Sequence, residues 1–320
     1  MRKGIVSAGL IAALWVWSLH TLGQVKDPEF IGSIRCRTCH RIFQKELIEN
    51  FLKSPHAKAM ADIRKTKEAI VSDLTTAPFP KEKIAYAFGS GIKEQAYLGQ
   101  DLKLLPGRWL AAEKRWVPEK EADARKECLG CHTLGYDPSS GKWLEIGVGC
   151  ESCHGPGSEH EKAVSSNLPV DAIRKAILSP KKIEPKRAGM ICGQCHSSGK
   201  DKSGSYPFPV GFRAGDNLED FFLDSKPKGP GRNQQFSDLI RSKHWEKDVI
   251  CYKCHDPHGF TKQPHLLRKP VNDLCMECHG STVKDIKSHA PNAPEGATCA
   301  TCHMPNGRHT FEKPGEEGGK

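Results

Sequence analysis

The sequence predicts a mainly α-helical fold with extensive loops and a small β-hairpin insert, and three observations lead to this prediction. Residues 42–65 carry apolar side chains at helical spacing, which is typical of an amphipathic helix. Residues 83–117 alternate between apolar and polar side chains and are interrupted by Gly89-Ser90-Gly91, which indicates the hairpin. The third observation is a pattern, Cys-x-x-Cys-His, that occurs seven times in 320 residues of which only 37% are hydrophobic.

The seven motifs, numbered 1 to 7 along the chain, use all fourteen cysteines. In order they are Cys36/Cys39/His40, Cys128/Cys131/His132, Cys150/Cys153/His154, Cys192/Cys195/His196, Cys251/Cys254/His255, Cys275/Cys278/His279 and Cys299/Cys302/His303. Closed structural zinc sites need four ligands, so such motifs would have to associate in pairs, and seven is an odd number. A c-type haem explains every position, because two thiols add to the porphyrin vinyl groups and the histidine binds iron. The sequence therefore predicts seven covalently attached haem c groups.

The N-terminus has the features of an export signal. Arg2 and Lys3 precede an apolar run from Gly4 to Leu19, and small residues follow before Gln24, so residues 1–23 are expected to be a cleaved signal peptide. An uncleaved anchor is the alternative, but about 16 apolar residues fall short of the roughly 20 that span a bilayer. No later stretch is apolar enough to cross a membrane. We therefore expect an exported protein, periplasmic or extracellular, with no membrane span after cleavage.

The charge balance is explained by the predicted cofactors. A formal net charge of +10 could indicate nucleic-acid binding. However, a bis-histidine haem with two ionised propionates carries −1 when ferric and −2 when ferrous. Seven such haems would bring the chain without Arg2 and Lys3 to about +1 oxidised and −6 reduced. The excess lysines and arginines are interpreted as counter-charges for propionates, and nucleic-acid binding is not expected.

The predicted haem content also sets the organisation of the chain. After signal removal there are about 42 residues per haem, too few to surround each one with a deep core of side chains. We therefore expect a multihaem cytochrome c fold organised around a packed haem chain. Residues 24–197 are expected to form a four-haem part that includes the β insert, and residues 198–232, rich in Gly and Pro, a linker. Residues 233–320 would form a three-haem part with a helix over 233–246 and a flexible tail from Lys313.

The residue on the far side of each iron decides what a haem can do, because a sixth protein ligand leaves no position for substrate. Outside the motifs and the signal there are seven histidines, which are the candidate distal ligands: His56, His160, His244, His258, His265, His289 and His309. His160 and His258 follow their own motifs too closely to reach the opposite face of the same iron, so each is expected to cap a neighbouring haem. Met60 and Met190 are alternatives, although packing roles fit them better.

Four segments resemble a superfamily of multihaem c-type cytochromes. "CRTCHRIFQKELIENFLKSPHAKAM" is similar to the first haem segment of hydroxylamine oxidoreductase and of the tetrahaem electron carrier that serves it, which implies an axial role for His56. "GVGCESCHGPGSEH" is similar to the same group, with His160 as the axial residue. "SKHWEKDVICYKCHDPHG" resembles decahaem conduit cytochromes, which implies that His244 and His258 cap haems. "CHMPNGRHTF" is similar to the terminal motif of pentahaem nitrite reductases.

The departures from these relatives concern catalysis. The Cys-x-x-Cys-Lys motif of pentahaem nitrite reductases is absent from this sequence, and hydroxylamine oxidoreductases have eight haems and a cross-linked tyrosine with no recognisable equivalent here. The resemblance therefore supports the haem scaffold without a particular chemistry.

Three functions remain open from the sequence. The first is electron transfer along a row of mostly bis-histidine haems, with redox partners such as a membrane quinol oxidase, an outer-membrane conduit or copies of itself. The second is an oxidoreductase with one open haem that acts on a small nitrogen or sulfur compound; His265, in a Pro-flanked basic stretch, is the weakest distal candidate, which makes a missing sixth ligand credible. The third is a subunit of an extracellular filament in which His56 or His309 caps a haem of the next copy.

Overall fold

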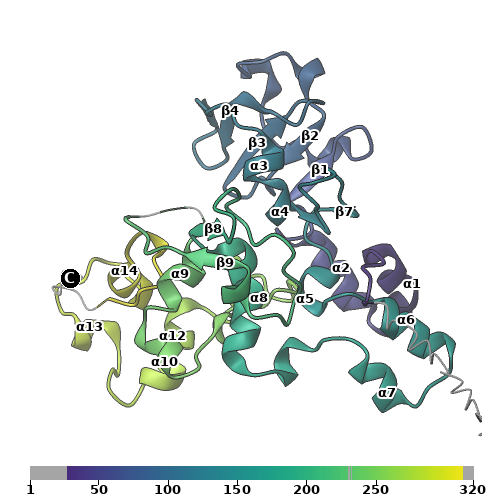
Figure 1. The fold of residues 1–320 in the computed structure, drawn as a ribbon. Coiled ribbons are helices and arrows are strands. Elements are labelled where there is room, and N and C mark those ends of the chain that lie inside the picture. Colours follow the sequence, from purple (N-terminus) through teal and green to yellow (C-terminus); the bar gives the residue numbers. More distant parts are fainter. Residues whose placement is uncertain (1–26, 230, 232, 313–320) are drawn as a thin grey trace, which may run out of the picture.

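The computed structural model describes residues 27–229, 231 and 233–312 (Figure 1). The expected signal peptide and the tail from Lys313 lie outside the described residues. The helices of the first half are α1 (Ser33–Phe43), α2 (Lys45–Lys53), α3 (Ala124–Glu127), α4 (Leu129–His132), α5 (Glu151–His154), α6 (Ser158–Ser165), α7 (Val170–Lys175) and α8 (Pro185–His196). Those of the second half are α9 (Gln235–Leu239), α10 (Lys243–Glu246), α11 (Cys251–Cys254), α12 (Val271–His279), α13 (Ile286–His289) and α14 (Cys299–His303). The mainly helical, loop-rich class is confirmed.

Helices α1, α2, α6 and α7 lie at one end of the molecule and α12 to α14 at the other, with α8 between them and a β-sheet on one side (Figure 1). None of the described helices is both long enough and apolar enough to span a membrane.

The helix expected over 42–65 is shorter and divided. Helix α1 ends at Phe43, α2 begins at Lys45, and α2 ends at Lys53. The residue after α2, Ser54, precedes Pro55 and is extended, as expected for a residue whose helical conformation a following proline disfavours. The chain then turns and enters a strand at Met60, so the apolar pattern correctly indicates helix but extends it too far.

The β insert is larger than a hairpin. Five antiparallel strands form one sheet in the order of the chain: β1 (Met60–Asp62), β2 (Tyr86–Phe88), β3 (Glu94–Leu98), β4 (Leu104–Leu110) and β5 (Arg115–Val117). Gly89 and Gly91, in the turn from β2 to β3, have φ values of 91° and 77°, where glycine carries no steric penalty. The predicted hairpin is thus correct for β2 and β3, but β1 is too short for its alternation to be recognised in the sequence.

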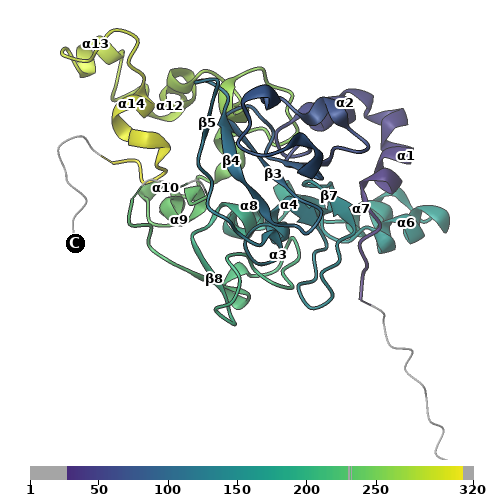
Figure 2. The ribbon, with the colours of Figure 1, turned by 90° about the horizontal axis from the view of Figure 1, so that it is seen from above.

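The two faces of the sheet bury different clusters because strand side chains alternate. One face packs Tyr97 and Ala87 against Phe79 and Leu105. On the other, Met60 and Leu98 pack against Leu129 of α4. Seen from above, the sheet lies over α4 and α8 (Figure 2). The insert therefore covers motif 2.

The segment 198–232, expected to be a linker, is folded into the body. It contributes an antiparallel pair, β8 (Gly199–Asp201) with β9 (Phe222–Asp224), and a further pair, β6 (Thr133–Leu134) with β7 (Glu145–Ile146), lies earlier in the chain. Phe208, Leu218 and Phe222 of this segment are buried. Its abundant Gly and Pro residues therefore form turns between packed side chains, and the division into four-haem and three-haem parts stays a prediction.

The helix expected over 233–246 is two helices, α9 and α10. The break falls at residues 240–242, and the Ser242 hydroxyl accepts the Trp245 amide hydrogen at 3.4 Å, which starts α10. Beyond this point the packing changes, because no side chain of residues 251–312 is fully buried. Side chains alone do not make a core in the C-terminal part.

Candidate haem centres

Every motif lies on or at the end of a helix, on α1, α4, α5, α8, α11, α12 and α14 in order. Residues three and four positions apart share one face of a helix, so the two cysteines and the histidine of a motif are directed to the same side. All fourteen cysteines, each within the described residues, are free thiols. The local fold therefore presents two reactive sulfurs and one imidazole together at each motif.

Six of the seven motif histidines face a second histidine ring. The distances between ring centroids lie between 6.1 and 6.3 Å in all six pairs. The pairs, with the motif histidine first, are His40 with His160, His154 with His258, His196 with His56, His255 with His309, His279 with His244 and His303 with His289.

This spacing fits one iron between two imidazoles. A metal–imidazole bond is about 2.0 Å long and a ring centroid lies about 1.1 Å behind its nitrogen, so two ligands on opposite sides put their centroids roughly 6.2 Å apart. The interplanar angles range from 18° for His154 with His258 to 81° for His196 with His56, as expected if each ring rotates freely about the iron–nitrogen axis. The residues therefore fit bis-histidine haems.

The ring nitrogens are held in the state that binding iron requires. The Nδ1 atoms of His132 and His154 lie 2.9 Å from the backbone oxygens of Ala59 and Leu178, and His160 has the same contact with Ile173. An Nδ1–H that donates to a carbonyl leaves Nε2 as the nitrogen with a free lone pair. Burial lowers the pKa of His56 to about 4, which keeps this imidazole neutral near pH 7.

Most of the paired rings come from distant parts of the chain, and their roles as distal ligands stay a prediction. The structure opposes His160 to His40 of motif 1, although His160 follows motif 3. It opposes His258 to His154 of motif 3, although His258 follows motif 5. Each ring therefore lies across from a motif other than the one it follows.

His132 of motif 2 is the exception among the described histidines, because no such pair includes it. Its ring stacks on Phe88 at a centroid distance of 3.8 Å and an angle of 25°. Phe88 thus covers the flat side of the imidazole and does not stand opposite it. Among the described residues, the structure thus brings no second histidine ring opposite His132.

His265, the remaining candidate, lies elsewhere. Its backbone oxygen is 2.8 Å from Nδ1 of His255, so it lies on the motif side of that centre. Its φ of 57° is in the left-handed region, which costs a non-glycine residue energy and directs this carbonyl. Met60 and Met190 both pack in apolar clusters, in keeping with packing roles.

The motifs contact one another through their cysteines. The thiol of Cys36 is hydrogen-bonded to Cys150, Cys192 to Cys251, and Cys275 to Cys299. Motifs 3 and 4 are joined by a 2.8 Å hydrogen bond from the Gln194 side chain to the Ser152 carbonyl.

Two further contacts complete the set. Cys254 of motif 5 lies within electrostatic range of Cys275 and Cys278 of motif 6. Cys131 of motif 2 is hydrogen-bonded to Cys195 of motif 4. The contacts connect the motifs in the order 1, 3, 4, 5, 6 and 7, with motif 2 as a branch at motif 4.

The second cysteines of the two terminal motifs, Cys39 on α1 and Cys302 on α14, are not brought into this series. Cys39 is exposed and Cys302 is half-buried, and neither is hydrogen-bonded to a cysteine of another motif within the part of the chain that the structure describes. The physical reason is position, because each terminal motif has a neighbour on one side alone and meets it through its first cysteine, Cys36 or Cys299. The structure therefore places Cys39 and Cys302 only within their own motifs, and their attachment to haem, like that of the other twelve cysteines, stays a prediction.

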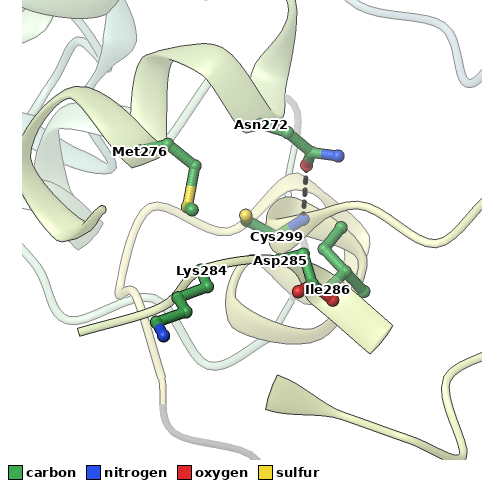
Figure 3. Close-up of a pocket in the computed structure, with 6 residues that line it drawn as sticks. All are labelled: Asn272, Met276, Lys284, Asp285, Ile286 and Cys299. Carbon is green, nitrogen blue, oxygen red and sulfur yellow. Dashed lines mark hydrogen bonds between the residues drawn. The ribbon is translucent and has the colours of Figure 1, made fainter. Parts of the chain in front are cut away.

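A cavity of about 300 Å³ adjoins the sulfur of Cys299 in motif 7 (Figure 3). Met276 and Asn272 of α12 and the segment Lys284 to Ile286 line it. The Asn272 side-chain oxygen accepts the Cys299 amide hydrogen at 2.9 Å, which fixes the start of α14 against α12. The cavity thus lies beside the first cysteine of motif 7.

Sequence reasoning missed the polar groups that hold the motifs together. Glu151, inside motif 3, is 1% exposed, and its carboxylate accepts hydrogen bonds from the amides of Ile31, Gly32 and Gly157 at 2.7–3.1 Å. These bonds fasten the start of motif 1 to motif 3. The only sequence signal for Glu151 is its position between the two cysteines of motif 3, and the motif itself does not specify which residue stands there.

The fold and these centres define a c-type cytochrome. The family model for cytochrome c554 and c-prime matches residues 106–155, and the doubled CXXCH motif model matches residues 245–284. A multiheme cytochrome MtrA of Shewanella baltica is 27% identical over 62% of this chain and 50% of its own. The cytochrome c-554 of Nitrosomonas europaea is 27% identical over 50% of this chain and 54% of its own.

The fold has a solved counterpart in the outer cell wall cytochrome OcwA. The two structures superpose with a TM-score of 0.69 at 19% sequence identity, over 88% of this chain and 79% of the other. The chain spans about half the length of the two curated relatives. Together these likenesses place the chain among the multihaem c-type cytochromes, with covalent haem c as its cofactor. The resemblance predicted from the sequence is confirmed at this level.

Proposed function

We propose that this chain is a heptahaem cytochrome that passes electrons along a row of mostly bis-histidine haems, in the periplasm or at the cell exterior. The observation that carries the proposal is the series of links between motifs: cysteines meet at three steps, the Gln194 side chain bonds to the Ser152 carbonyl between motifs 3 and 4, and Cys254 lies near Cys278 between motifs 5 and 6. A thioether sulfur lies at the edge of its porphyrin, so touching cysteines bring porphyrin edges together. The protein then sets spacing and potential, while iron carries the electron.

The spatial order supports transport between the two ends of the molecule. Motif 1 lies on α1 at one end and motif 7 on α14 at the other (Figure 1). Electrons would enter and leave at these ends and exchange with redox partner proteins. The relative named as an outer cell wall cytochrome favours a location outside the cytoplasm.

The experiment removes one haem from the row. Current is measured through single holoprotein molecules held between two electrodes. The variant Cys251→Ala/Cys254→Ala removes the haem of motif 5 and is expected to reduce the current at least tenfold, because it opens a gap in the row. The matched variant Cys128→Ala/Cys131→Ala also removes one haem, but from the branch, and is expected to reduce the current far less. Mass spectra count the haems, and equal currents from the two variants would contradict the proposed order.

A second candidate function, an oxidoreductase with one open haem for a small nitrogen or sulfur compound, is favoured by the unpaired position of His132. A haem with one histidine ligand is high-spin and binds small ligands. The ferrous holoprotein is therefore expected to bind one carbon monoxide. His309→Ala is expected to raise the number to two, and His265→Ala to leave it at one. Seven attached haems with no binding of carbon monoxide would exclude this function.

A further inference from the structure

Helices α6 and α7 lie at the edge of the molecule farthest from α12 to α14, and the chain after α7 runs back toward α8; residues 158–182 are called the α6–α7 arm (Figure 1). Three large apolar side chains of the arm are exposed: Val164 by 41%, Leu168 by 45% and Val170 by 59%. These three side chains, which fall within seven positions around the α6–α7 turn, are called the apolar patch. Apolar patches with a polar rim are typical of surfaces that bind another protein.

Four basic side chains, called the basic rim, follow the patch along the chain. Arg174 and Lys175 end α7, and Lys181 and Lys182 follow in the next turn, all four exposed. The arm, residues 158–182, contains five basic and three acidic side chains, a net charge of +2, and from residue 170 to 182 the balance is four basic to one acidic. Asp171 approaches Arg174 only to 4.0 Å, with both side chains mostly exposed, and offsets little of this charge.

The arm also contacts the axial ligands of two haem centres. The backbone oxygen of Ile173 is 2.9 Å from Nδ1 of His160, which lies opposite motif 1. The backbone oxygen of Leu178 is 2.9 Å from Nδ1 of His154 of motif 3. A protein bound to the outside of the arm would therefore be separated from two centres by little more than one layer of backbone.

We propose that the α6–α7 arm is the docking surface for an acidic electron-transfer protein, which exchanges electrons with the centres of motifs 1 and 3. The basic rim attracts and orients an acidic partner, and the apolar patch excludes water at the contact. Electron exchange requires a partner close to the haem centres, whereas lipid binding does not. The contact of the arm with two predicted axial ligands therefore favours a redox protein over a membrane surface. The inference rests on the proposed function, because docking here matters only if the haems carry electrons.

The test measures the rate at which reduced flavodoxin, a small acidic electron carrier, reduces the ferric holoprotein. The variant Lys181→Glu/Lys182→Glu is expected to lower the second-order rate constant about tenfold at low ionic strength, and added salt to remove the difference. The variant Arg174→Glu/Lys175→Glu is expected to have the same effect. The control Lys200→Glu/Lys202→Glu makes the same charge change on β8 and at the residue directly after it, away from the arm, and is expected to change the rate less than about twofold.

The outcomes separate this inference from the proposed function. Rates that fall equally in the arm variants and the control would overturn the docking surface, since only total charge would then matter. The same holds if the arm variants keep the wild-type rate while dithionite still reduces all haems, and in that case the proposed function stands. Loss of binding to anionic vesicles in the arm variants, or a dimer in sedimentation that these variants abolish, would assign the surface to lipid or to a second copy and would also overturn the proposal.

Discussion

A buried ion pair between Asp238 and Arg308 is expected to hold the distal histidine of motif 5 in place. Asp238 on α9 is 1% exposed, and its carboxylate accepts two hydrogen bonds from the Arg308 guanidinium at 2.7 and 2.8 Å. It also accepts the backbone amide hydrogen of His309 at 3.2 Å, and the His309 ring faces His255. Asp238→Asn removes the charge and should loosen the segment that carries His309.

The size of the effect follows from burial. Removing one partner of a buried ion pair costs about 3–5 kcal/mol. Arg308 is 19% exposed and asparagine keeps one oxygen, so the lower end applies, about 3 kcal/mol. A change of this size shifts the equilibrium constant between the closed and the open segment by about a hundredfold. Hydrogen exchange of the backbone amides of residues 307–311 in the holoprotein is expected to accelerate by this factor, and the ferric spectrum to gain a high-spin component.

The control is Glu121→Gln, which breaks the exposed pair of Lys103 with Glu121 and should cost less than about 1 kcal/mol. Arg308→Lys keeps the charge but loses the two-point contact, and an intermediate rate is expected. Exchange in Asp238→Asn within about threefold of the wild type would refute the positioning role of this pair.

Three further predictions concern packing, charge and pH. Gly130→Ala in motif 2 should cost about 1–3 kcal/mol in a denaturant titration, because its Cβ would lie 2.1 Å from Phe208, and adding Phe208→Ala should recover part of the loss. Glu151→Gln removes a buried negative charge between the centres of motifs 1 and 3, so spectroelectrochemical titration should show a higher potential for at least one haem; unchanged potentials would contradict this. Backbone amides of α8 lower the pKa of Glu184, so its stabilisation of α8 is present above the ordinary pKa of 4.5 and is lost as pH falls through the lowered value. Glu184→Gln should abolish that acid dependence of amide exchange in α8, and its persistence would assign it to other groups.

The sequence predicts best what short stretches of chain determine. The five residues of a motif fit one haem whatever surrounds them, so the nature of the cofactor could be inferred before the fold was known. The seven candidate histidines could likewise be counted, but their partners could not be assigned. The path of the chain between two histidines decides which rings face each other. Although there are as many candidate histidines as motif histidines, no candidate ring among the described residues faces His132 of motif 2.

The errors in the fold have a common physical cause. Glycine and proline predict a linker in residues 198–232, yet Phe208 of that segment packs against Gly130 of α4. The helix expected over 42–65 ends early because Pro55 outweighs the apolar period. In both cases a single residue decides the structure, Phe208 by its packing contact and Pro55 by the turn. A prediction from the average pattern of many residues does not detect the effect of one.

The pairing of the histidines indicates why so small a side-chain core is sufficient. Covalent attachment of haem is local, but axial coordination would join residues 120 positions apart in His40 with His160 and 140 apart in His56 with His196. If such a link acts as a covalent cross-link does, closing a loop of about 100 residues removes unfolded-state entropy worth about 4–5 kcal/mol. The two loops overlap, so their contributions do not simply add. Under the proposed ligation, iron supplies the long-range contacts that a hydrophobic core supplies elsewhere. The part of the chain with no fully buried side chain, residues 251–312, contains three of the seven motifs and therefore depends on iron most.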